Sequence, residues 1–254
     1  MFGIHVNKKE HPILLKMHEY CELKKQSEGI LLTEGKIIPL IYKKLHKAYG
    51  KQKWWPTTLE GELHPSYHGR KVGERERFEI VVGAILTQNT SWKNVEKAIA
   101  NLNKKGILSI SKIKKTNKKI LANLIKPSGY FNQKAERLKI AAEFFSKNKK
   151  PTRDELLAVN GIGPETADSI LLYAFDVPVF VVDAYTKRIF SRIGVCDGKC
   201  SYDELQAIFH KSLPKNAKLF NEYHALLVEL AKQHCKKAPA CKECPVYANC
   251  KRLI

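Results

Sequence analysis

Acidic residues are scarce in this sequence of 254 residues, where 25 Asp and Glu stand against 45 Lys and Arg and give a formal net charge of +20 at pH 7. An excess of this size, spread along the chain, indicates a polyanionic partner, because each Lys or Arg placed on a phosphate releases counterions. A lysine-rich surface that serves only solubility or heat tolerance is the alternative. The charge favours nucleic acid as the partner.

Long apolar runs are also missing, and none approaches the length that spans a membrane. Residues 1–12 carry charges early and have no apolar core of signal-peptide length. We therefore expect a soluble monomer without a membrane partner, located in the cytoplasm with the nucleoid, where thiols stay reduced. The seven cysteines are expected to be metal ligands or thiols before they are disulfides.

Strand signals are few and helical periodicity dominates, so the sequence predicts an all-α fold. Residues 75–88 are apolar nearly all round, which is typical of a buried central helix. Residues 177–182 are rich in β-branched side chains and are predicted to be extended. The other predicted helices cover 37–49 after Pro39, 91–102, two short segments within 109–126, 132–147, one opened by a capping box at 152–155, one opened by Pro164, 184–192, one opened by a capping box at 201–204, and 216–234.

The stretch "NGIGPETAD", residues 160–168, places two glycines directly before a helix that opens with Pro164. A dinucleotide-binding fingerprint needs a preceding strand and a third glycine, and both are missing. A helix, a short Gly-x-Gly turn and a second helix form a helix-hairpin-helix instead. Its glycines let the backbone approach a phosphate, and the free amides of the second helix face the anion. Such a hairpin binds DNA by its backbone; an ordinary helical hairpin with a glycine stop is the alternative.

Four cysteines lie within sixteen residues near the end of the sequence, spaced C-x5-C-x2-C-x5-C. They are Cys235, Cys241, Cys244 and Cys250. In a reducing compartment this density indicates a metal site, either a [4Fe–4S] cluster or a four-thiolate zinc site, and the spacing alone does not decide between them. Cys21, Cys196 and Cys200 lie outside this block and receive no ligand role.

The order of these features resembles the endonuclease III superfamily of helix-hairpin-helix DNA glycosylases. The resemblance covers roughly 70–254 and includes "GAILTQNTSWKNVEKAI", "GYFNQKAERL", "VNGIGPETAD", "VVDAYTKRI" and the cysteine block. It implies a two-lobed fold: a six-helix barrel at 69–177 carrying the hairpin at about 152–175, and a discontinuous iron–sulfur domain made of 1–68 and 178–254 with its cluster loop at 235–250. It also implies a [4Fe–4S] cofactor with a structural and DNA-contacting role.

Members of this superfamily flip a damaged nucleotide out of double-stranded DNA and cut its N-glycosidic bond. By motif match, Asp183 takes the place of the essential carboxylate, which stabilises oxocarbenium character on the sugar or orients a water; its alternative role is to cap the next helix. Gln88 and Asn89 follow the central helix, and the glutamine is expected to fill the gap left by the flipped base. The alternative is a helix-end amide that satisfies carbonyls. The hairpin residues expected to bind DNA are Gly161, Ile162, Gly163 and Thr166.

Glu165 stands two residues after the second glycine, where bifunctional members carry a lysine. That lysine forms a Schiff base with the sugar and nicks the strand. A carboxylate cannot form this imine, so we expect a monofunctional glycosylase that uses water as its nucleophile. Lys187 lies near Asp183 in the sequence but not at the motif position.

Glutamate at this position resembles the methylpurine glycosylases of the superfamily, which also have an aromatic loop ahead of the barrel. Here "KQKWWPTT" supplies Trp54, Trp55 and Pro56, and Phe78 is expected to close the other side of a stacking slot. An N3- or N7-alkylated purine is cationic, so an aromatic face attracts it and Glu165 complements its charge. Each of these residues has a purely structural alternative role. The Trp-Trp-Pro segment can anchor the chain to the core, Phe78 can be a core residue, and Glu165 can simply suit a helix N-terminus.

The sequence thus predicts excision of purines such as 3-methyladenine. One rival is the same fold acting on oxidised pyrimidines or on mismatched thymine and uracil. A second rival is a non-catalytic DNA-binding repair factor that uses the hairpin and the cluster only to dock. The presence of both Asp183 and the hairpin argues against the second rival.

Overall fold

The structure is a computed structural model that describes residues 34–69, 72–196 and 198–253. The chain divides into two compact units: the hairpin unit, Lys53–Val181, and the cysteine unit, Met1–Gln52 with Val182–Ile254. The sequence placed the first boundary near residue 68, but residues 53–68 belong to the hairpin unit, because they pack on its central helix. In the part of the chain that the structure describes, no helix is long and apolar enough to cross a membrane.

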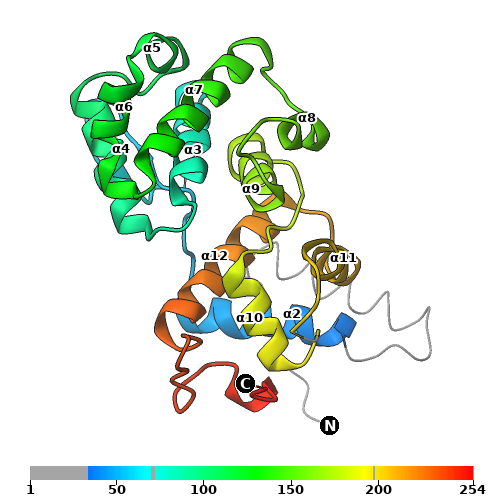
Figure 1. The fold of residues 1–254 in the computed structure, drawn as a ribbon. Coiled ribbons are helices and arrows are strands. Elements are labelled where there is room, and N and C mark those ends of the chain that lie inside the picture. The colour runs from blue at the N-terminus through cyan, green and yellow to red at the C-terminus, as the bar shows by residue number, and fades with distance from the viewer. Residues whose placement is uncertain (1–33, 70–71, 197, 254) are drawn as a thin grey trace. The chain divides into compact units, whose positions relative to one another are not determined.

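The hairpin unit is built around helix α3, Glu74–Thr87. This helix packs against α4, α7 and α9 (Figure 1), and its side chains are buried almost all round, which confirms the predicted central helix. The other elements of the unit are β1 (Thr57–Thr58), β2 (Pro65–Ser66), α4 (Trp92–Lys104), α5 (Ile110–Lys115), α6 (Lys118–Leu124), the 3-10 turn η1 (Lys126–Ser128), α7 (Phe131–Lys147), α8 (Arg153–Leu157) and α9 (Pro164–Phe175).

Strands β1 and β2 form a small antiparallel sheet in which Thr57 pairs with Ser66. The sequence did not predict it, because two residues per strand are too few for a periodic pattern. The sheet is fixed to α3 by Glu79, whose Oε1 accepts hydrogen bonds from the backbone N–H of Thr58 at 2.8 Å and from its hydroxyl at 2.7 Å. Burial raises the pKa of the Glu79 carboxyl. A buried acid therefore attaches the tryptophan-bearing segment to the central helix.

The helix-hairpin-helix consists of α8 and α9. The predicted capping box is confirmed: the hydroxyl of Thr152 accepts from the N–H of Glu155, whose carboxylate accepts from the N–H of Thr152. The two helices are joined by an ion pair, since the fully buried Asp168 accepts from Arg153 Nε at 2.8 Å and Nη2 at 3.2 Å. A buried pair of this kind fixes how α8 lies on α9, since removing either partner leaves a buried charge without compensation.

The cysteine unit contains four helices among its described residues: α2 (Glu34–Tyr49), α10 (Ala184–Ile193), α11 (Tyr202–Ser212) and α12 (Ala217–Gln233), with the 3-10 turn η2 (Tyr247–Asn249). Helix α2 packs against α11 and α12, and α10 packs against α12 (Figure 1). In their core, the hydroxyl of the buried Tyr223 donates to the carbonyl of Ile38 at 2.8 Å. The capping box at Ser201 and Glu204 is confirmed.

Two helix starts differ from the prediction. Helix α2 begins five residues before Pro39 and contains it, so the helix lacks one backbone hydrogen bond at this proline. Helix α7 begins at Phe131, after Tyr130 with a φ of 45°, and not with Asn132 as its cap. Residues 177–182 have no strand pairing within the described chain, which agrees with an extended connection.

Candidate functional site

The hairpin turn leaves the first amides of α9 without a side-chain cap. Gly161 has a φ of 88°, and the exposed Gly163 is the cap residue, followed by Pro164 at the first helical position. Ile162 is 5% exposed and its N–H donates to the carbonyl of Val159 at 3.0 Å, so this residue anchors the turn in the core. Uncapped N–H groups at a helix start form an anion site. The turn therefore leaves N–H groups at the start of α9 that can accept an anion.

Gln88 is held by the hairpin. Its Nε2 donates to the carbonyl of Gly161 and to the hydroxyl of Thr166, both at 3.0 Å. Its Oε1 accepts from Arg137 Nη1 at 2.5 Å. Asn89, the next residue, is exposed with a φ of 54°, which asparagine tolerates well. The structure thus joins the predicted residues Gln88, Gly161 and Thr166, and it adds Arg137, which the sequence analysis missed.

Trp54 and Trp55 belong to an aromatic cluster on the hairpin unit. The ring of Trp54 lies 5.1 Å from Trp92 and 5.6 Å from Tyr67. The ring of Trp55 lies 5.2 Å from Trp92 and 5.0 Å from Tyr173. Edge-to-face pairs at these distances are favourable beyond their buried area. Tyr67, Trp92 and Tyr173 were not predicted, because they come from three separate segments.

Two indole N–H groups of the cluster donate no hydrogen bond to a described residue. Trp55 Nε1 and Trp92 Nε1 are buried and have no hydrogen-bond partner among the described residues. Gly83 of α3 makes room for Trp55, since a Cβ there would lie 3.0 Å from the indole Cζ2. Buried donors in native proteins are nearly always paired, and an unpaired one calls for a ligand or a water. The cluster therefore combines packed aromatic rings with two buried donors that no described side chain or carbonyl satisfies.

Three predicted pocket residues lie elsewhere or contribute less. Phe78 is 5% exposed and pairs with Phe145 of α7 at 6.5 Å, and within the described chain no ring contact joins it to the tryptophans, so it is a core residue. Pro56, next to Trp55 in the sequence, is buried. Glu165 is exposed at the second position of α9, where a carboxylate also suits the helix dipole.

Asp183 is the cap residue of α10 and belongs to the cysteine unit. Its Oδ1 accepts from the N–H of Thr186 at 2.7 Å and from the hydroxyl at 2.8 Å, and its Oδ2 lies 3.6 Å from His224 Nε2 on α12. Burial raises the pKa of the Asp183 carboxyl, but the nearby His224 and the bonds from Thr186 outweigh it and hold that pKa below its usual value. Although only 14% of its side chain is exposed, this carboxylate is built to stay ionised. The distance to His224 is that of an ion pair and exceeds an ordinary hydrogen bond.

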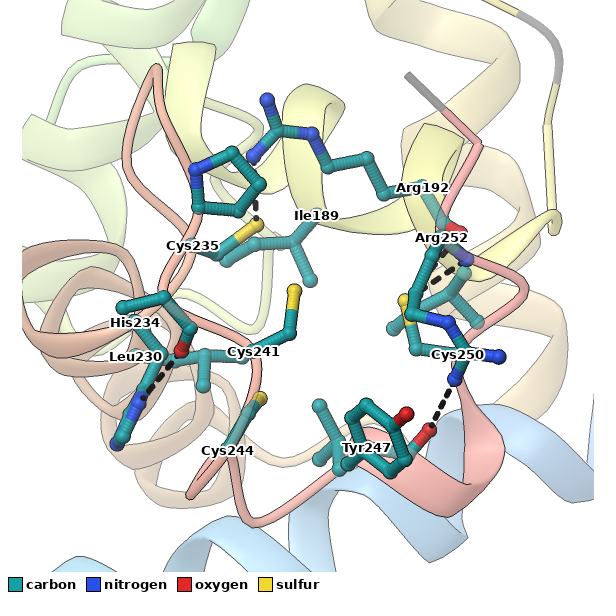
Figure 2. A pocket seen from close by; sticks show the side chains of 14 residues that line it. Ile189, Arg192, Leu230, His234, Cys235, Cys241, Cys244, Tyr247, Cys250 and Arg252 are labelled. Atoms are coloured by element: carbon teal, nitrogen blue, oxygen red, sulfur yellow. Dashed lines mark hydrogen bonds between the residues drawn. The ribbon is translucent and has the colours of Figure 1, made fainter.

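The four cysteines of the C-terminal block line one cavity. Figure 2 shows their side chains facing the same space, with Cys235 and Cys250 on opposite sides. Burial and the neighbouring cysteines raise the pKa of the Cys244 thiol, an effect that a bound metal would reverse. Among the described residues, no three ligating side chains lie close enough to hold a single metal ion. Of the remaining cysteines, Cys21 lies outside the described residues.

Two arginines of α10 hold this loop. Arg188 Nε donates to the carbonyl of Cys235 at 2.8 Å. Arg192 donates to the carbonyls of Lys236 at 2.6 Å and Lys237 at 3.0 Å, and its Nη1 lies 3.5 Å from Cys235 Sγ (Figure 2). Both arginines therefore fix the backbone of the loop next to its first cysteine. Helix α10 thus carries Asp183 at its start and supports the cysteine loop at its end.

Comparison with known proteins gives the same class. The model of the HhH-GPD superfamily of base excision DNA repair proteins matches residues 82–215, and the chain belongs to this family. The protein is a base excision repair DNA glycosylase of the helix-hairpin-helix type, which confirms the resemblance to the endonuclease III superfamily.

Among its relatives is the protein MJ1434 of Methanocaldococcus jannaschii, whose name describes it as a DNA repair glycosylase; it is 47% identical over 83% of this chain and 94% of its own length. Endonuclease III of Thermotoga maritima is 30% identical over 70% of this chain and 84% of its own. A similar solved structure is the H. pylori 3-methyladenine DNA glycosylase MagIII bound to 1,N6-ethenoadenine. It has a TM-score of 0.65 and 30% identity and covers 80% of this chain and 98% of that one.

Proposed function

We propose that this glycosylase is monofunctional and removes alkylated purines such as 3-methyladenine from duplex DNA, acting as a monomer. The observation that carries the proposal is the aromatic cluster around Trp54 and Trp55. Electron-rich rings attract a cationic purine. The similar H. pylori enzyme supports it, since that structure holds a modified adenine.

Asp183 supplies the charge that the reaction needs. When the N-glycosidic bond breaks, the bond electrons leave with the base and the sugar gains oxocarbenium character. The ionised carboxylate, held by Thr186, stabilises that cation and orients a water, whose oxygen bonds to the sugar carbon as its proton is lost. A cationic alkylpurine leaves as a neutral base, so no strong general acid is required.

Strand cleavage by a lysine is not part of the proposal. Glu165 occupies the motif position and cannot form an imine. Lys134, one turn before the Arg137 that contacts the hairpin, is 1% exposed and its amine donates to two carbonyls, so it is not available as a nucleophile. The product is therefore an intact strand with an abasic site.

We further propose that Cys235, Cys241, Cys244 and Cys250 bind a [4Fe–4S] cluster. The four thiols line one cavity and supply the donors that a cluster of this kind requires. The resemblance to the endonuclease III superfamily supports the cluster over zinc. When bound, the cluster cross-links the loop and takes no part in base excision. Iron and acid-labile sulfide analysis of the purified protein tests this, and stoichiometric zinc without iron would contradict it.

The test of function is base release from methylated duplex DNA, with strand breaks scored before and after alkali. We expect free 3-methyladenine, with breaks only after alkali. Release of oxidised pyrimidines or of mismatched thymine and uracil, without release of methylpurines, would show that the proposed substrate class is wrong. Breaks without alkali would contradict the monofunctional chemistry. Tight binding with no release from any lesion would indicate a docking factor.

A further inference from the structure

Helix α7 presents two cations, one turn apart, to the C-terminal end of α3. Lys134 Nζ donates to the carbonyls of Leu86 at 2.8 Å and Ser128 at 2.7 Å, and it is almost fully buried. Arg137, three residues later, donates from Nη1 to Gln88 Oε1 at 2.5 Å. A helix C-terminus carries partial negative charge and unpaired carbonyls, so cations are stabilising there. The end of α3 is therefore fixed by α7.

Gln88 passes this constraint to the hairpin. Its oxygen accepts from Arg137, and its nitrogen donates both hydrogens, one to the carbonyl of Gly161 and one to the hydroxyl of Thr166. A carboxamide has two N–H donors and one oxygen, so each group of this side chain has a partner. The amide bridges α7 to the turn between α8 and α9.

Arg137 also touches the turn directly. Gly161 has a φ of 88°, and a Cβ at this position would lie 2.6 Å from Cγ, Cδ and Nε of Arg137. The glycine is thus required twice, by its left-handed backbone and by the arginine stem that packs against it. The aliphatic stem of Arg137 packs directly against the turn. Its guanidinium reaches the turn indirectly, through the hydrogen bond to Gln88.

We propose that Arg137 is a positioning residue that orients the Gln88 amide and holds the hairpin turn in its DNA-binding conformation. The inference rests on the proposed DNA-binding role of the hairpin. A guanidinium bonded to the amide oxygen polarises the amide and strengthens its N–H donors to the turn. In the free protein the Gln88 side chain holds the turn through three hydrogen bonds. All three must break if this side chain moves to contact DNA.

The experiment is a double-mutant cycle on the full-length protein with an undamaged duplex oligonucleotide. Arg137→Met removes the guanidinium and keeps an unbranched stem against Gly161, and Gln88→Ala removes the amide. Lys147→Met is the matched control, because it makes the same charge change on the same helix at an exposed residue whose ion pair is with Glu143. Circular dichroism and thermal unfolding check that each variant folds.

We expect Arg137→Met and Gln88→Ala each to weaken DNA binding about tenfold. The double variant should bind DNA only slightly more weakly than either single variant, because both changes break the same set of hydrogen bonds. Losses that multiply to about a hundredfold would overturn the proposal. So would a fall of about 0.9 in the salt slope for Arg137→Met alone, which is the signature of a direct phosphate contact. An Arg137→Met protein that binds like Lys147→Met would also overturn it.

Hydrogen exchange of the free protein separates this inference from the proposed function. The hydrogen-bonded amides of Ile162 and Ala167 should exchange at least about fivefold faster in Arg137→Met than in Lys147→Met, since the turn opens more often. Equal exchange rates in the two variants would overturn the proposal that Arg137 holds the turn. Gly163→Asp tests the hairpin itself: if that variant binds DNA normally, the hairpin's role in binding fails, while the exchange result still decides whether Arg137 holds the turn.

Discussion

Helices α9 and α10 share the residue at their third position but have different caps. Each has a buried threonine at its third position, Thr166 in α9 and Thr186 in α10. The cap residue of α9 is Gly163, which has no side chain, whereas the cap of α10 is Asp183, whose carboxylate accepts from the N–H of Thr186. The threonine hydroxyl of α10 donates to that carboxylate, while that of α9 accepts from a side chain at the end of α3.

This difference assigns the two helix starts to opposite tasks. Helix α9 leaves its first amides free to accept an anion from outside, which we propose is a DNA phosphate. Helix α10 contains its own anion and uses its amide and threonine hydroxyl to keep that anion ionised despite burial. We therefore propose that the start of α9 binds DNA and that the start of α10 takes part in catalysis. A change of the cap of α9 should impair binding, and a change of the cap of α10 should impair catalysis.

Asp183→Asn should have the largest effect. Asparagine is as good a helix cap as aspartate, so the variant should fold, and the free energy of unfolding should fall only by what the ionised carboxylate contributes. The loss of charge should lower the single-turnover rate of base release about a thousandfold, with DNA affinity kept. The matched control is Asp176→Asn at the end of α9, where the φ of 55° also suits asparagine. More than a tenth of the wild-type rate in Asp183→Asn would remove the catalytic assignment.

Gly163→Asp gives α9 the cap that α10 has. Gly163 has an ordinary φ, and a Cβ at this position would have no other atom within 4 Å, so aspartate fits without strain. The variant should be as stable as wild type or more so by a few tenths of a kcal/mol. Its carboxylate should repel phosphate and weaken DNA binding about thirtyfold, by analogy with a like charge placed at an interface. Gly163→Ala, which adds a side chain without charge, is the control; equal losses in both would point to shape and not to charge.

His224→Gln sharpens the account of the α10 start. A carboxyl with a lowered folded-state pKa contributes stability above its unfolded pKa of about 3.9, and this contribution is lost as the pH falls through the folded pKa. Removing His224 should raise the pKa of Asp183, so the acid limb of the single-turnover rate should move to higher pH by about one unit.

The control for this variant is His210→Gln on α11, a histidine stacked on Phe220 within the same unit. Its acid limb should stay in place. If both profiles coincide with that of the wild type, His224 does not affect the ionisation of Asp183.

What the sequence predicted well was local. The cap of α10, the two capping boxes and the glycines of the hairpin each lie within a few residues of their partners, so their spacing carries the information. The buried central helix was predictable for a similar reason, since its apolar residues follow one another. The four cysteines share a sixteen-residue block.

What the sequence did not predict was non-local. Gln88 and Arg137 are 49 residues apart, and no periodicity in either helix indicates that they meet. The aromatic cluster draws on four segments of the chain, so only the adjacent Trp54 and Trp55 could be singled out. Phe78 was assigned to the pocket because it is aromatic and near the start of a central helix. Its position on the side of α3 that faces α7 depends on tertiary packing.

The two threonines give the smallest and most specific test. Thr186→Val removes one hydrogen bond to Asp183 and keeps the shape, so base release should slow about threefold to tenfold with DNA affinity unchanged. Thr166→Val removes an acceptor from Gln88, so DNA affinity should fall by a similar factor with the rate from the bound state unchanged. Each variant is the control for the other, measured as affinity and single-turnover rate at saturating enzyme. If both variants lowered the same quantity, the two helix starts would share one task, and the separation of binding from catalysis along this chain would be wrong.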